Sequence, residues 1–183
     1  MQVHKGSARI VIAIPTIHVA VKLPIIRILM VSKKTYQLIR RSEWDRLAKL
    51  CQWNSKYHRS FKRLLLKGIL DNWSEFFFYL CNRENPFPQA TYFSFFGLIN
   101  LQRYDTPCDI PERTFYKQLS ELTNRTAMKD LHHFENSNNF SFRDGRLVMH
   151  DYGSKVTRAI IVLYGENTHY SFDPDYTFDG KAW

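Results

Sequence analysis

The chain begins with β-branched and apolar residues in a pattern that predicts strands. Residues 1–31 contain three such runs, QVHKGSA, ARIVIAI and IHVAVKLP, with a turn at Pro15-Thr16. The stretch from Arg9 to Val31 is apolar, but prolines and basic residues interrupt it, which argues against a spanning helix or a signal peptide. We therefore expect three short strands here and no membrane insertion.

Three later segments have a helix-like pattern. Residues 35–52 form the first. In the second, from about 57 to 82, large apolar side chains recur every three or four residues, and Pro86 and Pro88 prevent the helix from continuing. The third covers ERTFYKQLSELTNRTAMK, residues 112–129.

Strand patterns return between and after these helices. Residues 90–105, ATYFSFFGLINLQRYD, predict two antiparallel strands joined tightly at Gly97, and DTPCDIPE reads as a linker. A second hairpin is predicted around the turn Arg143-Asp144-Gly145, and the tail that follows it shows few helix signals. The order of strands, helices, strands, helix and hairpin predicts an α+β chain with two lobes.

Composition narrows the class of protein. Hydrophobic residues make up 44% of the chain and aromatic residues 15%, which is typical of a folded globular protein. The three cysteines, Cys51, Cys81 and Cys108, are an odd number without paired spacing. We therefore expect reduced thiols, a cytoplasmic location and no cysteine-based metal site.

Charge is concentrated in one segment. Residues 33–67 contain eleven lysines and arginines against two acidic residues, so this segment alone accounts for the net charge of +9. Such a segment can bind nucleic acid or an acidic protein, and it can also be a solvated helical face.

Several residues with suitable chemistry for phosphoryl transfer follow one another along the chain. Lys22 lies on a predicted strand after Gly6, and Glu75 lies on the second predicted helix. Asp130 and Asp151 flank a group of asparagines. A strand lysine held by a glutamate can orient phosphates, and one aspartate can accept a proton while the other binds Mg²⁺.

In this order the residues resemble the protein-kinase-like superfamily, particularly its small bacterial and phage members. VAVK, ending at Lys22, resembles the strand-three lysine motif, and DLH at 130–132 resembles a catalytic loop. DGRLVMHDYG resembles the hairpin that leads into the metal-binding DFG motif. The resemblance implies an antiparallel sheet with a helix in an N-lobe, residues 1–104, with a basic helical insertion at about 33–67. A reduced C-lobe, residues 105–183, would hold the catalytic loop and the hairpin.

The resemblance also implies roles for single residues, with ATP and Mg²⁺ as cofactors. Lys22 would orient the phosphates, Glu75 would fix Lys22, and Asp130 would accept the proton of the substrate hydroxyl. Asp151 would bind Mg²⁺ together with an asparagine. Contacts to ATP are implied at Gly6, Ser7, Ala20, Lys22, Leu101 and Gln102.

The chain departs from the pattern of the family at both phosphate-binding elements. Only Gly6 remains of the glycine-rich loop, which reduces the backbone cradle. Glu43 lies at the more usual distance from Lys22 along the chain, whereas Glu75 lies on the helix that leads directly into the next strands. We prefer Glu75, which makes the basic segment an insertion.

The metal-binding asparagine is also displaced. The expected position holds Glu135. Asn139 precedes a strand-like Phe-Ser-Phe and is our first choice after a short insertion, and Asn136 is the second.

Only thirty residues follow Gly153, and they contain no Ala-Pro-Glu motif, so later C-lobe helices are not expected. The leading hypothesis is a minimal kinase that phosphorylates Ser, Thr or Tyr of a partner protein, such as a host protein. The alternatives are a small-molecule kinase, a non-catalytic binding module of the pseudokinase type, and a nucleic-acid-binding module that uses residues 33–67.

Overall fold

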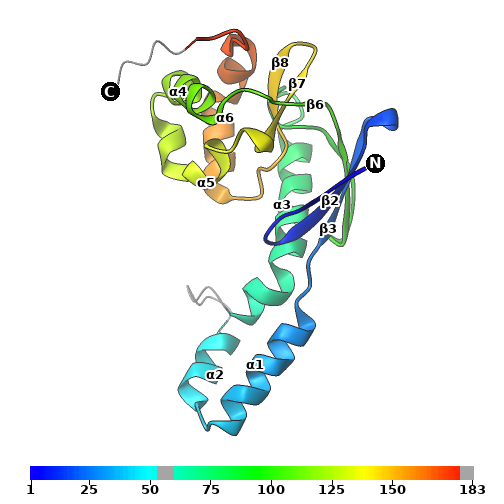
Figure 1. Ribbon diagram of the computed structural model, residues 1–183, viewed down its shortest axis with the longest axis vertical. Coiled ribbons are helices and arrows are strands. Elements are labelled where there is room, and N and C mark those ends of the chain that lie inside the picture. Colours follow the sequence, from blue (N-terminus) through cyan, green and yellow to red (C-terminus); the bar gives the residue numbers. More distant parts are fainter. Residues whose placement is uncertain (53–59, 178–183) are drawn as a thin grey trace.

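The computed structural model describes residues 1–52 and 60–177, and these form an α+β fold. Five strands form an antiparallel sheet in the order β1-β2-β3-β5-β4 (Figure 1). Their bounds are β1 Gln2–Lys5, β2 Arg9–Ile14, β3 Val19–Pro24, β4 Thr91–Phe95 and β5 Ile99–Arg103. The three N-terminal strands and the hairpin at Gly97 were predicted from the sequence, and both are confirmed.

Helix α3, Lys67–Cys81, packs on this sheet and continues a π-helical turn at Lys62–Leu66. The buried side chain of Asn72 holds the helix in place, because its Nδ2 donates to the backbone oxygen of Gly97 at 2.9 Å. In return, Nδ2 of Asn100 on β5 donates to the backbone oxygen of Asn72 at 2.7 Å. The helix predicted from about 57 to 82 is therefore present over 62–81, and residues 57–59 lie outside the described part of the chain.

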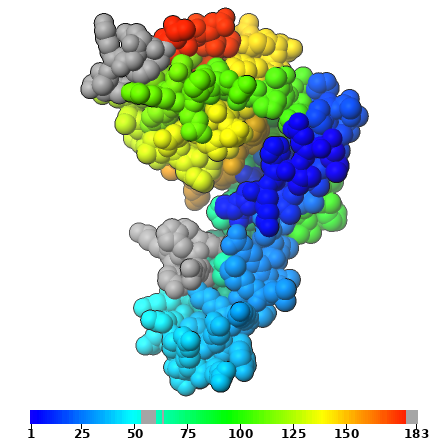
Figure 2. All heavy atoms as spheres, viewed as in Figure 1, coloured from blue at the N-terminus to red at the C-terminus, as the bar shows by residue number. Residues whose placement is uncertain are grey.

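Helices α1, Ile28–Arg40, and α2, Trp44–Cys51, form an arm that projects away from the sheet (Figures 1 and 2). The single helix predicted for residues 35–52 is wrong in two respects. The helical structure begins at Ile28, seven residues before the predicted start at residue 35. A turn with a left-handed backbone at Ser42 (φ 54°) divides it into two helices.

The second half of the chain has its own three-stranded antiparallel sheet, β6-β7-β8, and a group of helices. The predicted hairpin is confirmed, with left-handed backbone at Asp144 and Gly145 in its turn. The bounds are β6 Thr106–Pro107, β7 Phe140–Arg143, β8 Arg146–Met149, α4 Glu112–Leu122, α5 Leu131–Phe134 and α6 Lys155–Ser171, with short 3-10 turns at Thr126–Asp130 and Ser137–Asn139.

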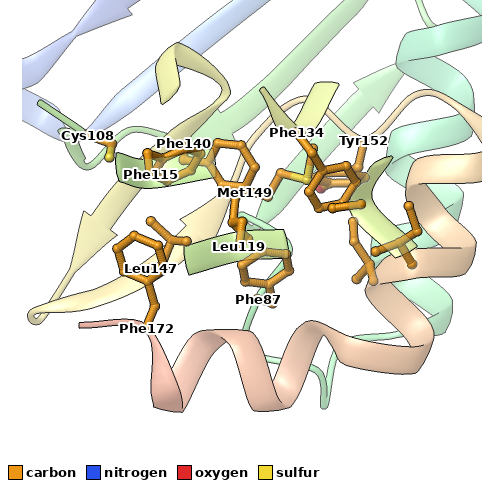
Figure 3. Close-up of a cluster of buried hydrophobic side chains, with 13 residues drawn as sticks. Phe87, Cys108, Phe115, Leu119, Phe134, Phe140, Leu147, Met149, Tyr152 and Phe172 are labelled. Atoms are coloured by element: carbon orange, nitrogen blue, oxygen red, sulfur yellow. The ribbon is translucent and has the colours of Figure 1, made fainter. Parts of the chain in front are cut away.

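The aromatic core of the molecule lies in this half and joins its sheet to its helices (Figure 3). Phe115, Phe140 and Phe172 form a chain of ring contacts with centroid separations of 4.8 and 5.4 Å. Phe87 enters the same core from the segment between α3 and β4 of the first half, and its backbone oxygen accepts from the amide of Met149 on β8 at 2.8 Å. This pairing fixes the two halves to each other.

Three predictions for this half need correction. The helix predicted over 112–129 ends at Leu122, because Asn124 and Arg125 have left-handed backbone that no helix accommodates. The predicted linker DTPCDIPE contributes the short strand β6.

The tail predicted to have few helix signals contains α6, which has 17 residues. Its buried face includes Thr157, Gly165 and Thr168 beside Ile160 and Ile161, and these small and polar residues conceal its apolar stripe in the sequence.

Within the described residues, we find no helix with the length and apolar character needed to cross a membrane. The three cysteines are free thiols, as expected; Cys51 and Cys81 are exposed, and Cys108 is buried.

Candidate functional site

A cavity of about 700 Å³ lies between the five-stranded sheet and the second half of the chain. The sheet presents one face to it, because side chains alternate along a strand and the register aligns Val11 with Lys22 and Ala20 with Gln102. The opposite wall includes His133, the asparagines that follow it, and the segment from His150 to Ser154.

Three charged side chains that line this cavity, Arg9, Lys22 and Asp151, form a cluster with the buried Glu75 behind them. Lys22 on β3 contacts Oε2 of Glu75 on α3 through its Nζ at 2.8 Å. Arg9 on β2 contacts Oε1 of Glu75 at 2.6 Å through Nη1, and Oδ1 of Asp151 at 2.5 Å through Nη2. Two cations and two anions therefore form one connected cluster, in which each carboxylate has at least one cationic partner.

Lys22 also connects the sheet to the far wall. Its ammonium group donates to the backbone oxygen of His150 at 2.5 Å, one residue before Asp151. Two of its three donors are thus used, on Glu75 and His150, and one remains. The strand lysine is 3% exposed, yet it lines the cavity.

The electrostatics of the cluster favour ionised carboxylates. Burial alone would raise the pKa of the Asp151 carboxyl, but Arg9, Lys22 and His133 outweigh it and hold this pKa well below its usual range. Burial lowers the pKa of the Lys22 ammonium, and the Glu75 carboxylate opposes that effect. Burial also lowers the pKa of the Arg9 guanidinium group. The carboxylates of Glu75 and Asp151 outweigh this effect, so the pKa of Arg9 is raised.

The structure forms the Lys22–Glu75 ion pair that we preferred from the sequence. The other candidate, Glu43, lies on the arm and contacts Nη1 of Arg46 at 2.6 Å instead. Helix α3 places Glu75 against the sheet because the helix runs directly into the segment that leads to β4.

Of the residues for which the family resemblance implied ATP contacts, Gly6, Ser7, Ala20 and Gln102 line the cavity together with Lys22. Leu101 is not among the described lining residues. It neighbours Gln102 in β5, and adjacent side chains of a strand point to opposite faces, so both cannot enter the same cavity.

Asp130 lies behind the wall of the cavity. Its Oδ1 contacts Nδ1 of His133 at 2.8 Å, and its Oδ2 accepts a hydrogen bond from the hydroxyl of Thr157 on α6. His133 itself lines the cavity, whereas Asp130 does not appear among the described lining residues. The aspartate is therefore fixed by two partners and reaches the cavity through a histidine.

The two candidate asparagines line the cavity with Asp151. Oδ1 of Asn136 accepts the backbone N–H of Asn138 at 3.0 Å, so this oxygen is already used. Asn139 donates through Nδ2 to the backbone oxygen of His133 at 2.9 Å, which orients its amide and leaves the oxygen as the acceptor.

No group of three or more histidine, cysteine or acidic side chains suited to a metal occurs in the described part of the chain. The donor set beside Arg9 and Lys22 instead consists of the Asp151 carboxylate and amide oxygens, whereas the other lining carboxylates, Asp71 and Asp105, are paired with Lys67 and Arg103. That set fits Mg²⁺ bound together with phosphate oxygens, which supply the remaining ligands and negative charge.

Sequence reasoning gave no role to Arg9, although a signal was present. Arg9 begins a strand of apolar residues and lies two positions before Val11, which pairs with Lys22. Because alternate residues of a strand lie on the same face of the sheet, Arg9 and Lys22 are on the same face. The roles of His133 and Thr157 could not be predicted from the sequence either, because their contacts with Asp130 depend on tertiary structure and have no local signal.

Comparisons of the chain with protein-family models, with curated proteins and with solved structures found no match. The function is therefore inferred below from the site itself.

Proposed function

We propose that this chain is an ATP-dependent phosphotransferase of a reduced, two-lobed protein-kinase-like type. One observation carries the proposal: Lys22 on a strand and Asp151 after a hairpin line a single cavity, and the buried Glu75 on a helix holds Lys22 from behind it. A lysine fixed by a buried glutamate and facing an ionised aspartate is an arrangement suited to orienting phosphates and their metal. The two lobes would be those predicted from the sequence, residues 1–104 and 105–183.

Lys22 would bind a phosphate oxygen with its remaining donor. Glu75 is fully buried and holds the ammonium group at 2.8 Å, so the cation is kept in one position before the nucleotide binds. Catalysis of phosphoryl transfer consists largely of such positioning and charge neutralisation. Gly6 and Ser7 in the β1–β2 turn would cover the phosphates, and Ala20 would leave room for the base.

The Asp130–His133 pair would serve the substrate hydroxyl. Asp130 accepts from Thr157 and contacts Nδ1 of His133, which orients the imidazole toward the cavity. His133 would accept the hydroxyl proton, and Asp130 would stabilise the resulting cation. In this proposal the proton acceptor is His133, which lines the cavity, and not Asp130, which we expected from the sequence to accept the proton directly.

Mg²⁺, when bound with the nucleotide, would neutralise charge on the transferring phosphates. Asp151 would hold it through its carboxylate and Asn139 through its amide oxygen. Asn136 is the weaker candidate, because its oxygen already accepts a backbone hydrogen bond.

The acceptor would be a Ser, Thr or Tyr hydroxyl of a partner protein, docked beside the cavity. The arm formed by α1 and α2 extends beyond the sheet and offers a large exposed surface for such a partner (Figure 2). A small-molecule hydroxyl is the alternative acceptor, because the same cavity admits one.

A second candidate function is non-catalytic binding, and one observation favours it. Arg9 occupies the carboxylate of Asp151 at 2.5 Å, on an oxygen that a metal would use. In that case the chain would act on its partner by contact alone.

Incubation with radiolabelled ATP, Mg²⁺ and host-cell lysate tests the proposal. We expect label on a discrete protein, and loss of that label in both Lys22→Met and Asp151→Asn. Arg83→Met, at an exposed position outside both the cavity and the arm, is the control with an equal change in charge to Lys22→Met. Absence of label together with absence of ATP binding would exclude the phosphotransferase. Equal labelling by all four proteins would show that the activity does not arise in this cavity.

A further inference from the structure

Arg9 lines the cavity and contacts Asp151, and the proposed chemistry gives it no role. It is 9% exposed, and its guanidinium group joins two carboxylates that come from different halves of the chain. Nη1 also lies 3.4 Å from Oδ1 of Asn72, the buried amide that fixes α3 on the sheet. A lysine could not replace it, because only the planar fork of an arginine presents two nitrogens to two acceptors at once.

The two carboxylates held by Arg9 differ in their access to the cavity. The side chain of Glu75 is fully buried, whereas that of Asp151 is 30% exposed. Glu75 has Lys22 as a second cationic partner, but Arg9 is the only cation within 4 Å of the Asp151 carboxylate among the described residues. The contact with Glu75 is therefore a fixed anchor, and the contact with Asp151 is the one that can open.

The charges of the cluster restrict what can bind first. Arg9 and Lys22 balance Glu75 and Asp151, so a divalent cation entering alone would meet two cations and no uncompensated carboxylate. A nucleoside triphosphate brings more negative charge than one Mg²⁺ neutralises. Together they give Arg9 an anionic partner and give Asp151 a cationic one.

We propose that Arg9 is an exchangeable counter-cation and phosphate ligand of this site, an inference that rests on the proposed function. Without nucleotide, Nη2 of Arg9 holds Asp151. When the triphosphate and Mg²⁺ bind, Arg9 releases Asp151 to the metal, keeps Nη1 on Glu75, and donates Nη2 to a phosphate oxygen. Arg9 thus replaces the backbone donors that the glycine-poor β1–β2 turn does not supply.

The test measures thermal unfolding and the affinity for a non-hydrolysable ATP analogue in the wild type and in Arg9→Met. For the wild type, we expect Mg²⁺ alone to leave the unfolding temperature unchanged, and Mg²⁺ with the analogue to raise it. In Arg9→Met, the uncompensated Asp151 binds Mg²⁺, so the metal alone raises the unfolding temperature. The affinity for the analogue falls by about tenfold or more, because one charge-assisted hydrogen bond is lost.

Two further variants complete the design. Arg46→Met removes an arginine that contacts Glu43 at 2.6 Å on the arm, outside the cavity, and it should behave as the wild type in both measurements. Arg9→Lys keeps the positive charge and is the substitute if Arg9→Met does not fold. Because the single nitrogen of a lysine cannot reproduce the two-nitrogen fork of the guanidinium group, it should hold Asp151 less firmly, and this variant should show the same metal response in weaker form.

Wild-type affinity for the analogue in Arg9→Met, or in Arg9→Lys, would overturn the inference and leave the proposed function intact. An equal response of wild type and Arg9→Met to Mg²⁺ alone would overturn it as well. A wild type that binds no nucleotide under any of these conditions would instead overturn the proposed function.

Discussion

At the scale of single residues, Tyr152 shows how a buried hydroxyl positions the neighbouring Asp151. The ring is fully buried, its hydroxyl donates to the backbone oxygen of Gln89 at 2.7 Å, and the hydroxyl of Thr91 lies 2.8 Å away. We predict that Tyr152→Phe lowers the free energy of unfolding by about 1–2 kcal/mol, because the carbonyl group of Gln89 loses its donor in a dry environment. Urea denaturation measures this change. Tyr36→Phe, at an exposed position on the arm, should have no effect, and an equal loss in both variants would contradict the prediction.

His169 gives a prediction for the dependence of stability on pH. Burial lowers the pKa of its imidazole, although the contact of Nδ1 with the backbone oxygen of Leu147 opposes that shift. Since the folded pKa lies below the unfolded value of about 6.5, the unfolded chain binds the proton first as the pH falls. The neutral His169 therefore contributes its full stabilisation at pH values above the unfolded pKa, and this stabilisation decreases as the pH falls below it.

His169→Asn places an amide nitrogen where Nδ1 lies, so the hydrogen bond can be kept without the titration. We predict that the variant loses less stability than the wild type between pH 7 and pH 5. The slope of the free energy of unfolding against pH should differ between the two proteins by the equivalent of up to about one bound proton. Urea denaturation at several pH values gives both slopes. Parallel curves would show that His169 does not titrate differently in the two states.

At the scale of elements, strands and their turns were predictable from the sequence, and the ends of helices were not. Gly97 and Asp144-Gly145 mark hairpins locally, because a left-handed backbone favours glycine or aspartate at those positions. The break at Ser42 and the buried polar face of α6 have no such marker. At the site, the Lys22–Glu75 pair followed from the order of the elements, whereas the roles of Arg9 and His133 emerge only when the two halves meet.

Gly97 is the glycine on which the packing of α3 against the sheet depends. It has φ of +73°, and a Cβ atom placed on it would lie 2.3 Å from the backbone oxygen of Ile69. Gly145 has φ of +77° but no atom within 4 Å of such a Cβ, which makes it a matched control for backbone strain alone. We predict that Gly145→Ala costs about 1–2 kcal/mol and that Gly97→Ala costs at least about 2 kcal/mol more, since backbone must move. Chemical denaturation compares the two, and equal costs would show that α3 adjusts freely.

At the scale of the whole molecule, the cavity and the arm are the two features that can bind partners, and they lie in different places. Arg9 and Lys22 cross from the sheet to the second half and contact Asp151 and the backbone of His150. A ligand in the cavity therefore contacts both halves. The arm, in contrast, contacts the rest of the chain at the base of α3 and leaves most of its surface exposed (Figures 1 and 2).

The arm also carries basic residues that suit an anionic partner. Lys33, Arg40 and Lys49 are exposed on α1 and α2. The arm has only two acidic residues, Asp45 on α2 and Glu43, which is already paired with Arg46. We predict that single-stranded RNA binds the protein at low salt and that Lys33→Glu, Arg40→Glu and Lys49→Glu together weaken binding. If all three contact phosphates, the slope of log affinity against log salt decreases by about two.

The control for this prediction is a second triple variant with the same net charge. Arg83, Lys129 and Lys155 are exposed and lie outside the arm, so Arg83→Glu, Lys129→Glu and Lys155→Glu change the total charge equally. Fluorescence anisotropy across a salt series should show the decreased slope only for the arm variant, because released counterions report contacts, whereas net charge acts at long range and is screened. Equal losses in both variants would mean that RNA responds to total charge, and the arm would then be a docking surface for an acidic or apolar protein partner rather than for nucleic acid.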